Sequence, residues 1–104
     1  MNKYRNRKTE VFGILFDSKH EAGQYIILKT RLDAGEITDL HCQVQYACDV
    51  NGQHVCNYFA DFTYLENGEL VVVDAKSEAT RKDKTYRIKK KLVEALYKIE
   101  IIEV

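Results

Sequence analysis

The sequence has no proline, no tryptophan and only five glycines in 104 residues. Because linkers between domains are usually rich in proline, glycine or small polar residues, their scarcity predicts one domain over 1–104. The sequence also lacks an apolar run of the roughly 18 residues that a membrane span needs, and its basic start precedes no apolar stretch of the signal-peptide type. We therefore expect a cytoplasmic protein with no membrane partner.

Cysteine is scarce as well, since Cys42, Cys48 and Cys56 are an odd number without a CxxC pair. This pattern predicts neither a disulfide framework nor a zinc site. His41 and His54 stand near two of these cysteines, but their spacing matches no zinc finger. We expect packing or surface roles for all five residues.

The sequence also has no net charge, because 16 basic residues balance 16 acidic residues. The charges are nevertheless segregated. Residues 1–8 carry four basic and no acidic residues, 76–91 carry eight basic and two acidic, and 9–75 carry three basic and eleven acidic. A basic surface can thus coexist with an acidic site, as a metal-dependent enzyme acting on a polyanion requires. A solvated lysine-rich helix face with a frayed tail is the structural alternative.

Two segments have the apolar periodicity of helices. The first is 18–34, where Ala22, Tyr25, Ile26 and Leu32 recur at helical spacing and Gly35 follows as a stop. The second is 85–97, with Ile88, Leu92, Ala95 and Leu96 on one side and Arg87, Lys90 and Lys91 near the other. Both are therefore expected to cover a sheet.

Strands are predicted between the helices. Asn-Gly pairs at 51–52 and 67–68 favour two-residue type I′ turns, because both central positions need positive φ. They separate antiparallel strands at 39–50, 53–66 and 69–76, while 11–16 is a short strand or hairpin and 99–104 a final strand. The predicted fold class is α/β (α+β) in the order α-β-β-β-α-β, an antiparallel three-strand meander plus a crossover helix and a C-terminal strand.

The turn at 67–68 also fixes the register of its hairpin. The numbers of facing residues add up to 135, so Asp61 faces Asp74. Strand alternation puts Lys76 on the face of Asp74 and opposite Phe59, and only a β-bulge would shift this register. Opposed carboxylates destabilise each other unless they share a proton, accept a cation or bind a divalent metal.

Glu21 is the candidate third carboxylate. A hard ion such as Mg²⁺ prefers oxygen ligands and shares them with substrate phosphates, which makes a third acid useful. Ser18 and Glu21 also fit a capping box, in which Glu21 would bond back to the Ser18 backbone, and the two roles can overlap. For Asp74 and Lys76, the structural alternative is an ion pair at a strand end.

On this frame, Glu21, Ala60-Asp61 and Asp74-Ala75-Lys76 resemble the PD-(D/E)XK, or restriction-endonuclease-like, nuclease superfamily, which includes Holliday-junction resolvases. A closer resemblance, from about Lys8 onward, is to a family of short phage and prophage proteins of unassigned function. It rests on Phe16-Asp17-Ser18-Lys19 with Glu21, Ala34-Gly35-Glu36-Ile37, Gln43, Ala60-Asp61-Phe62, Asp74-Ala75-Lys76 and residues 86–92. Ala60 departs from the proline of the superfamily motif, and Asp74 from its more usual glutamate.

The resemblance implies a metal-dependent DNA endonuclease that hydrolyses phosphodiester bonds, with branched, Holliday-junction-like DNA among its candidate substrates. Asp61, Asp74 and Glu21, with the Ala75 carbonyl, would hold Mg²⁺ or, in its place, Mn²⁺. Lys76 would position or activate the attacking water and offset charge on the phosphate. Gln43 would support these ligands from behind, unless it is an ordinary polar strand residue.

The basic segments would bind the DNA backbone without reading its sequence. They comprise Lys3, Arg5, Arg7 and Lys8 in a tail (1–8) that we expect to be flexible, and Arg81, Lys82, Lys84, Arg87, Lys90 and Lys91. The resemblance also implies a homodimer, because paired cuts need two sites. A phage-encoded protein would act in the cytoplasm of its bacterial host.

Two other functions stay open. One is a non-catalytic nucleic-acid-binding module with the same fold, which the absence of divalent-dependent cleavage would indicate. The other is an interaction domain whose second long helix docks on a partner through Ile88, Leu92 and Leu96. Binding to a protein partner that is insensitive to salt, without affinity for DNA, would favour the interaction domain.

Overall fold

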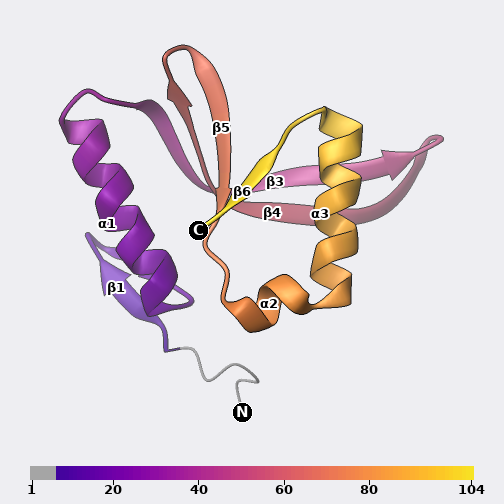
Figure 1. Cartoon of the computed structure of the whole chain (residues 1–104), viewed down its shortest axis with the longest axis horizontal. Helices are drawn as coiled ribbons and strands as arrows, with labels where there is room; N and C mark the ends of the chain where they lie inside the picture. The colour runs from indigo at the N-terminus through magenta and orange to yellow at the C-terminus, as the bar shows by residue number, and fades with distance from the viewer. Residues whose placement is uncertain (1–6) are drawn as a thin grey trace.

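The computed structural model describes residues 7–104, so the tail residues Lys3 and Arg5 lie outside the described part. In chain order its elements are β1 (Thr9–Val11), β2 (Ile14–Phe16), α1 (Lys19–Asp33), β3 (Thr38–Val50), β4 (Gln53–Glu66), β5 (Glu69–Asp74), α2 (Glu78–Lys82), α3 (Lys84–Tyr97) and β6 (Ile101–Glu103) (Figure 1). Among these described helices, none is long and apolar enough to cross a membrane. Only α2 has no counterpart among the predicted elements.

The tight turns have the predicted conformation. Asn51 and Asn67 have φ values of 51° and 53°, and the glycine after each has 78°, as a type I′ turn requires. Phe12 and Gly13 repeat this pattern at 51° and 78°. The segment over 11–16 is thus part of a hairpin, in which β1 pairs with β2.

The main sheet has the strand order β3-β4-β5-β6. Its first three strands form the predicted antiparallel meander, and β6 returns parallel to β5 after the crossover through α2 and α3. The ladder between β4 and β5 pairs Glu66 with Glu69 and ends at Phe62 with Val73. Facing numbers add up to 135 throughout, so the predicted register and the α+β fold class are confirmed.

Helices α1 and α3 lie on opposite sides of the sheet (Figure 1), each over its own apolar cluster. Under α1 lie Phe16, Ala22, Tyr25, Leu28, Ile37, Phe62, Tyr64, Val73 and Ala75. Under α3 lie Cys48, Tyr58, Ala60, Val72, Val93 and Ile101, while Cys42 and Cys56 pack at the margins of the two clusters. The three cysteines are free and take the packing roles predicted for them.

The packed face of each helix agrees with the prediction at some positions, such as Tyr25 and Leu92, and differs at others. Ile26 of α1 is exposed, and Leu28 is buried instead. On α3 the buried residue is Val93, whereas Ile88 and Leu96 are 67% and 40% exposed. Because neighbouring stripes of a helix can show equally regular apolar spacing, periodicity alone does not choose between them.

Side-chain alternation breaks in the middle of β4. Ala60 belongs to the cluster under α3 and Phe62 to the cluster under α1, although two residues apart on a regular strand share a face. Across from this point on β3, Gln43 has a φ of 52°, a left-handed conformation that bends the strand. Asp61 lies at the break, so its side chain is not placed by register alone.

Candidate functional site

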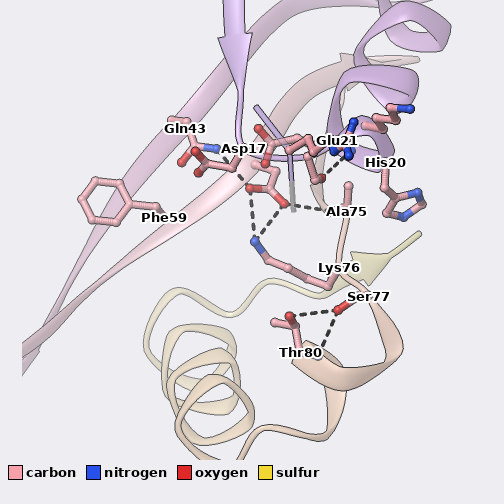
Figure 2. A pocket seen from close by; sticks show the side chains of 13 residues that line it. Asp17, His20, Glu21, Gln43, Phe59, Ala75, Lys76, Ser77 and Thr80 are labelled. Atoms are coloured by element: carbon pink, nitrogen blue, oxygen red, sulfur yellow. Dashed lines mark hydrogen bonds and ion pairs between the residues drawn. The ribbon is translucent and has the colours of Figure 1, made fainter. Parts of the chain in front are cut away.

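A cavity of about 520 Å³ lies between the start of α1, the middle of β3 and β4, and the segment that joins β5 to α2 (Figure 2). Its lining consists of Arg7, Asp17, Ser18, Lys19, His20, Glu21, Gln43, Phe59, Asp61, Ala75, Lys76, Ser77 and Thr80. Segments far apart in the sequence thus bring together six of the predicted site residues, namely Arg7, Glu21, Gln43, Asp61, Ala75 and Lys76.

Asp61 is the centre of this group. Its carboxylate is almost completely buried, with Oδ1 accepting hydrogen bonds from Gln43 Nε2 at 3.0 Å and from Lys76 Nζ at 3.2 Å. Oδ2 accepts from the Ala75 N–H at 2.9 Å and lies 3.0 Å from Lys76 Nζ. Asp61 is therefore held rigidly, and Gln43 has the supporting position predicted for it.

Glu21 has the predicted place at the start of α1, and only the Ser18 half of the expected capping box is formed there. Ser18 caps α1, since its Oγ accepts a hydrogen bond from the Glu21 N–H at 3.1 Å. The Glu21 side chain is 6% exposed and lies beside Asp61. Burial, and then the charge of Asp61, raise the pKa of Glu21 to about 8, so this carboxyl holds a proton at neutral pH.

Lys76 supplies the positive charge of the group. Burial alone would lower the pKa of its ammonium, but the charges of Asp61 and Asp74 outweigh burial and raise it. Lys76 therefore stays protonated and balances Asp61 as a partly buried ion pair.

The Asp74 carboxylate does not line this cavity, and the paired ladder ends one residue before Asp61 and Asp74 would face each other. Its Oδ1 accepts a hydrogen bond from the Asp61 N–H at 3.0 Å, and its Oδ2 accepts from the hydroxyls of Tyr58 and Tyr86. The prediction that both carboxylates project into one site is thus corrected. The break in alternation turns Asp61 toward α1 and leaves Asp74 under α3, where it holds the backbone of β4.

The surroundings of Asp74 form a satisfied buried network. Burial raises the pKa of Asp74, although the hydrogen bond from Tyr58 opposes this. Burial and the nearby Asp74 charge also raise the pKa of Tyr58, which keeps its hydroxyl as a donor. The Tyr86 hydroxyl lies 2.8 Å from Glu103 Oε2 as well as 3.2 Å from Asp74. Turning Asp74 into the cavity would break these bonds.

The cavity offers a divalent metal fewer carboxylate ligands than predicted. Within 7–104, no group of three or more His, Cys, Asp or Glu side chains is arranged to hold a metal ion, consistent with the position of Asp74. Glu21 and Asp61 remain an adjacent carboxylate pair beside Ala75. Mg²⁺ is commonly held by one or two carboxylates together with water and substrate phosphates. Burial is the main cause of the raised pKa of Glu21 and the charge of Asp61 adds to it, so a cation bound here would favour the ionised carboxylate.

The predicted DNA-binding residues fall into two groups. Some have partners within the chain: Arg81 donates to the Lys76 carbonyl, Lys82 pairs with Glu78, and Lys90 lies 3.9 Å from Glu94. Others line hollows or lie beside them: Arg7 lines the main cavity next to exposed Lys8, and Lys84, Arg87 and Lys91 surround a hollow of about 180 Å³ on α3. The second group is the better placed to contact phosphates.

Several lining residues were not predicted as functional, namely Asp17, His20, Phe59, Ser77 and Thr80. Ser77 caps α2 by accepting from the Thr80 N–H at 3.2 Å, an N-cap signal that could have been read in the sequence. His20 Nε2 lies 2.7 Å from the Val104 carbonyl oxygen. No local sequence signal predicts this contact, because residues 20 and 104 lie far apart in the sequence.

Comparison with known proteins identifies the family of the chain without supplying an activity. No curated protein matches the sequence, and no solved structure matches the fold. One protein-family model, described as "Protein of unknown function (DUF1064)", matches residues 1–102. Because the match covers nearly the whole chain, the protein belongs to the DUF1064 family.

Proposed function

We propose that this protein is a Mg²⁺-dependent endonuclease that hydrolyses phosphodiester bonds in DNA. The observation that carries the proposal is the convergence of Glu21, Asp61 and Lys76 in one cavity. Adjacent carboxylates suit a hard divalent cation, and a lysine beside them suits a phosphate. Arg7 adds a second cation to the lining.

Each residue would have a distinct task. A bound Mg²⁺ polarises a scissile phosphate and lowers the pKa of a bound water. Glu21 and Asp61 would hold that ion, and the Gln43 and Ala75 hydrogen bonds would keep Asp61 oriented. Lys76 would exchange one of its contacts with Asp61 for a phosphate oxygen and offset the charge that develops there. Mn²⁺ would replace Mg²⁺ at the same ligands.

Protons and metal would compete for Glu21. Since its pKa is about 8 in the metal-free protein, an incoming cation must displace a proton near neutral pH. Affinity for Mg²⁺ should consequently rise with pH up to about 8. Measuring this dependence would test the proposed ligand role, because a carboxyl outside the metal site would not produce it.

Finer parts of the proposal rest on the superfamily resemblance alone. They are the restriction-endonuclease-like nature of the fold, a phage-type role in the bacterial cytoplasm, action on branched, Holliday-junction-like DNA, and a homodimer that supplies two sites for paired cuts. The second long helix offers exposed apolar residues, Ile88 and Leu96, on which subunits or another partner could dock.

A non-catalytic DNA-binding module is the second candidate. The position of Asp74 favours it, because the tyrosines hold this carboxylate outside the cavity and leave two facing acids instead of three. The two candidates share the basic surface and differ in turnover.

Cleavage assays with Mg²⁺ or Mn²⁺ on branched, nicked and linear DNA would separate the candidates. We expect divalent-dependent cleavage by the parent protein and by Asp33→Asn, which alters an exposed acid of α1 paired with Lys29. Asp61→Asn should show no cleavage. DNA binding with no divalent-dependent cut in any substrate would leave the binding module as the function.

A further inference from the structure

We propose that Phe59 is a stacking platform for an unpaired base of DNA, placed where two hollows meet beside the Glu21 and Asp61 pair. This inference rests on the DNA-binding part of the proposed function and deepens it by naming the substrate class. The ligand would be a DNA strand with at least one unpaired nucleotide. The proposed metal site and the basic segments would work equally well on DNA without an unpaired nucleotide, so Phe59 adds this preference.

A second hollow adjoins the main cavity. It has a volume of about 310 Å³, and Asn57, Thr85 and Lys89 are among its lining residues. Phe59 and Lys76 line both hollows, so the two adjoin at these side chains. Figure 2 shows the Phe59 ring on the opposite side of Lys76 from His20, at one end of the main cavity.

The fold explains why this aromatic ring is exposed. The ladder between β4 and β5 ends at Phe62 and Val73, after which the chain leaves toward α2. Phe59 faces Gln45 of β3 on one side and has no ladder partner in β5 on the other. Its side chain is 49% exposed and belongs to neither apolar cluster. Packing of the core therefore does not account for a phenylalanine here.

The cations around Phe59 suit the phosphates of a nucleic-acid strand, although acids also line both hollows, Asp17, Glu21 and Asp61 in one and Asp83 in the other. Arg7 lines the hollow on one side, Lys89 lines the hollow on the other, and Lys76 lies between them. A strand that crosses Phe59 would thus find a cation for its phosphates in each hollow. Proteins that bind single strands combine such cationic grooves with aromatic rings on which bases stack.

An unpaired base is the part of DNA that fits this ring. Bases within a duplex are already stacked on both faces, whereas an unpaired base can be turned out and laid on an aromatic side chain. Such stacking tolerates any base, because every base has a π-face. Phe59 should therefore favour DNA with unpaired nucleotides over a continuous duplex, without selecting a sequence.

Equilibrium binding of labelled oligonucleotides, measured by fluorescence anisotropy in EDTA, tests this inference. The probes are an oligo-dT strand and a fully paired duplex of equal length. We expect Phe59→Ala to weaken binding of oligo-dT about tenfold, within the range for loss of one base-aromatic stack, and to change duplex binding by less than about twofold. Phe59→Tyr should retain parental affinity, since it keeps the ring.

Val55→Ala is the matched control, because Val55 is an exposed apolar residue of the same strand that lines neither hollow. It should bind both probes like the parent protein. Parental oligo-dT binding by Phe59→Ala, or an equal loss for both probes, would overturn the inference. Cleavage without Phe59-dependent binding would refute the stacking role of Phe59 and would still support the proposed nuclease activity. Phe59-dependent binding without cleavage would do the reverse, and binding to neither probe would contradict both.

Discussion

Replacing Glu21 by glutamine should change how the stability of the metal-free protein depends on pH. Burial and the Asp61 carboxylate raise the pKa of Glu21 from 4.5 to about 8 in the folded protein. The folded state thus holds this proton more tightly than the unfolded state. The resulting stabilisation is fully present below about pH 4.5 and is lost as the pH rises through about 8.

The size of the effect follows from the same pKa difference. At 1.36 kcal/mol for each pKa unit, the upper limit is about 5 kcal/mol. We expect about 2 to 4 kcal/mol, because Lys76 can shift toward an ionised Glu21 and offset part of the cost. Glutamine has the shape of the protonated acid and does not ionise. Parent and Glu21→Gln should therefore be similarly stable near pH 5, with the variant more stable at pH 8.5.

Urea denaturation in EDTA at several pH values between 5 and 8.5 measures this difference. The quantity of interest is the free energy of unfolding of Glu21→Gln minus that of the parent, which removes contributions from other titrating groups. Glu78→Gln is the control, because Glu78 is a highly exposed acid that pairs with Lys82 at the protein surface. If the curves for parent and Glu21→Gln stayed parallel over the whole range, the buried carboxyl pair would not exist as described.

Three further predictions concern the surroundings of the site. Tyr58→Phe should lower the free energy of unfolding by about 1 to 3 kcal/mol in urea titrations, since it removes a donor from buried Asp74; an unchanged value would show that the bond does not form. Charge reversal at Arg87 and Lys91 should weaken binding to all DNA sequences alike and reduce the salt dependence of binding. If parent and variant had equal salt slopes, these two residues would be only solvated surface. Mg²⁺ at 100 times its Kd should stabilise the parent protein by about 2.7 kcal/mol in thermal melts. Asp61→Asn should lose this stabilisation, and a variant that kept it would show that the ion binds elsewhere.

Local signals account for the parts of the fold that sequence predicts well. Each Asn-Gly pair sets a type I′ turn through positive φ at both positions, and this turn sets the register at the start of its hairpin. The register then holds along β4 and β5, whereas along β3 and β4 it shifts between Cys48 and Asp49 and between Thr38 and His41. The β4 and β5 ladder follows from the turn at 67–68 alone. The order of helices and strands follows in the same way from apolar periodicity.

The direction of the two aspartates depends on information that is not local. Gln43 adopts positive φ without being a glycine, and the break in alternation across from it turns the Asp61 side chain away from the network that holds the Asp74 carboxylate. The two tyrosines that receive Asp74 come from β4 and α3, which only the folded chain brings together. The sequence therefore predicts which residues approach one another, but not which way each carboxylate turns.

Because Asp61 and Asp74 have different hydrogen-bond partners, asparagine should be tolerated better at position 61 than at position 74. Asparagine at 61 can keep its one oxygen toward the Ala75 N–H and Lys76 Nζ, while Gln43 rotates its amide to accept from the new NH₂ group. Asparagine at 74 would face three donors, from Asp61, Tyr58 and Tyr86, with one acceptor oxygen fewer. Loss of activity in Asp74→Asn would therefore be mixed with loss of folding, whereas Asp61→Asn reports on chemistry.

The most direct test of the account combines cleavage rates with melting curves for Asp61→Asn and Lys76→Ala. The account predicts that Asp61→Asn stays folded, binds DNA and loses Mg²⁺-dependent cleavage by orders of magnitude, since an amide is a poor ligand for this ion. Lys76→Ala should lose cleavage too, with some loss of stability because the Asp61 carboxylate is deprived of its cation. Variants that unfold more easily, yet cleave DNA at the parental rate per folded molecule, would show that these residues form a structural ion pair and not a nuclease site.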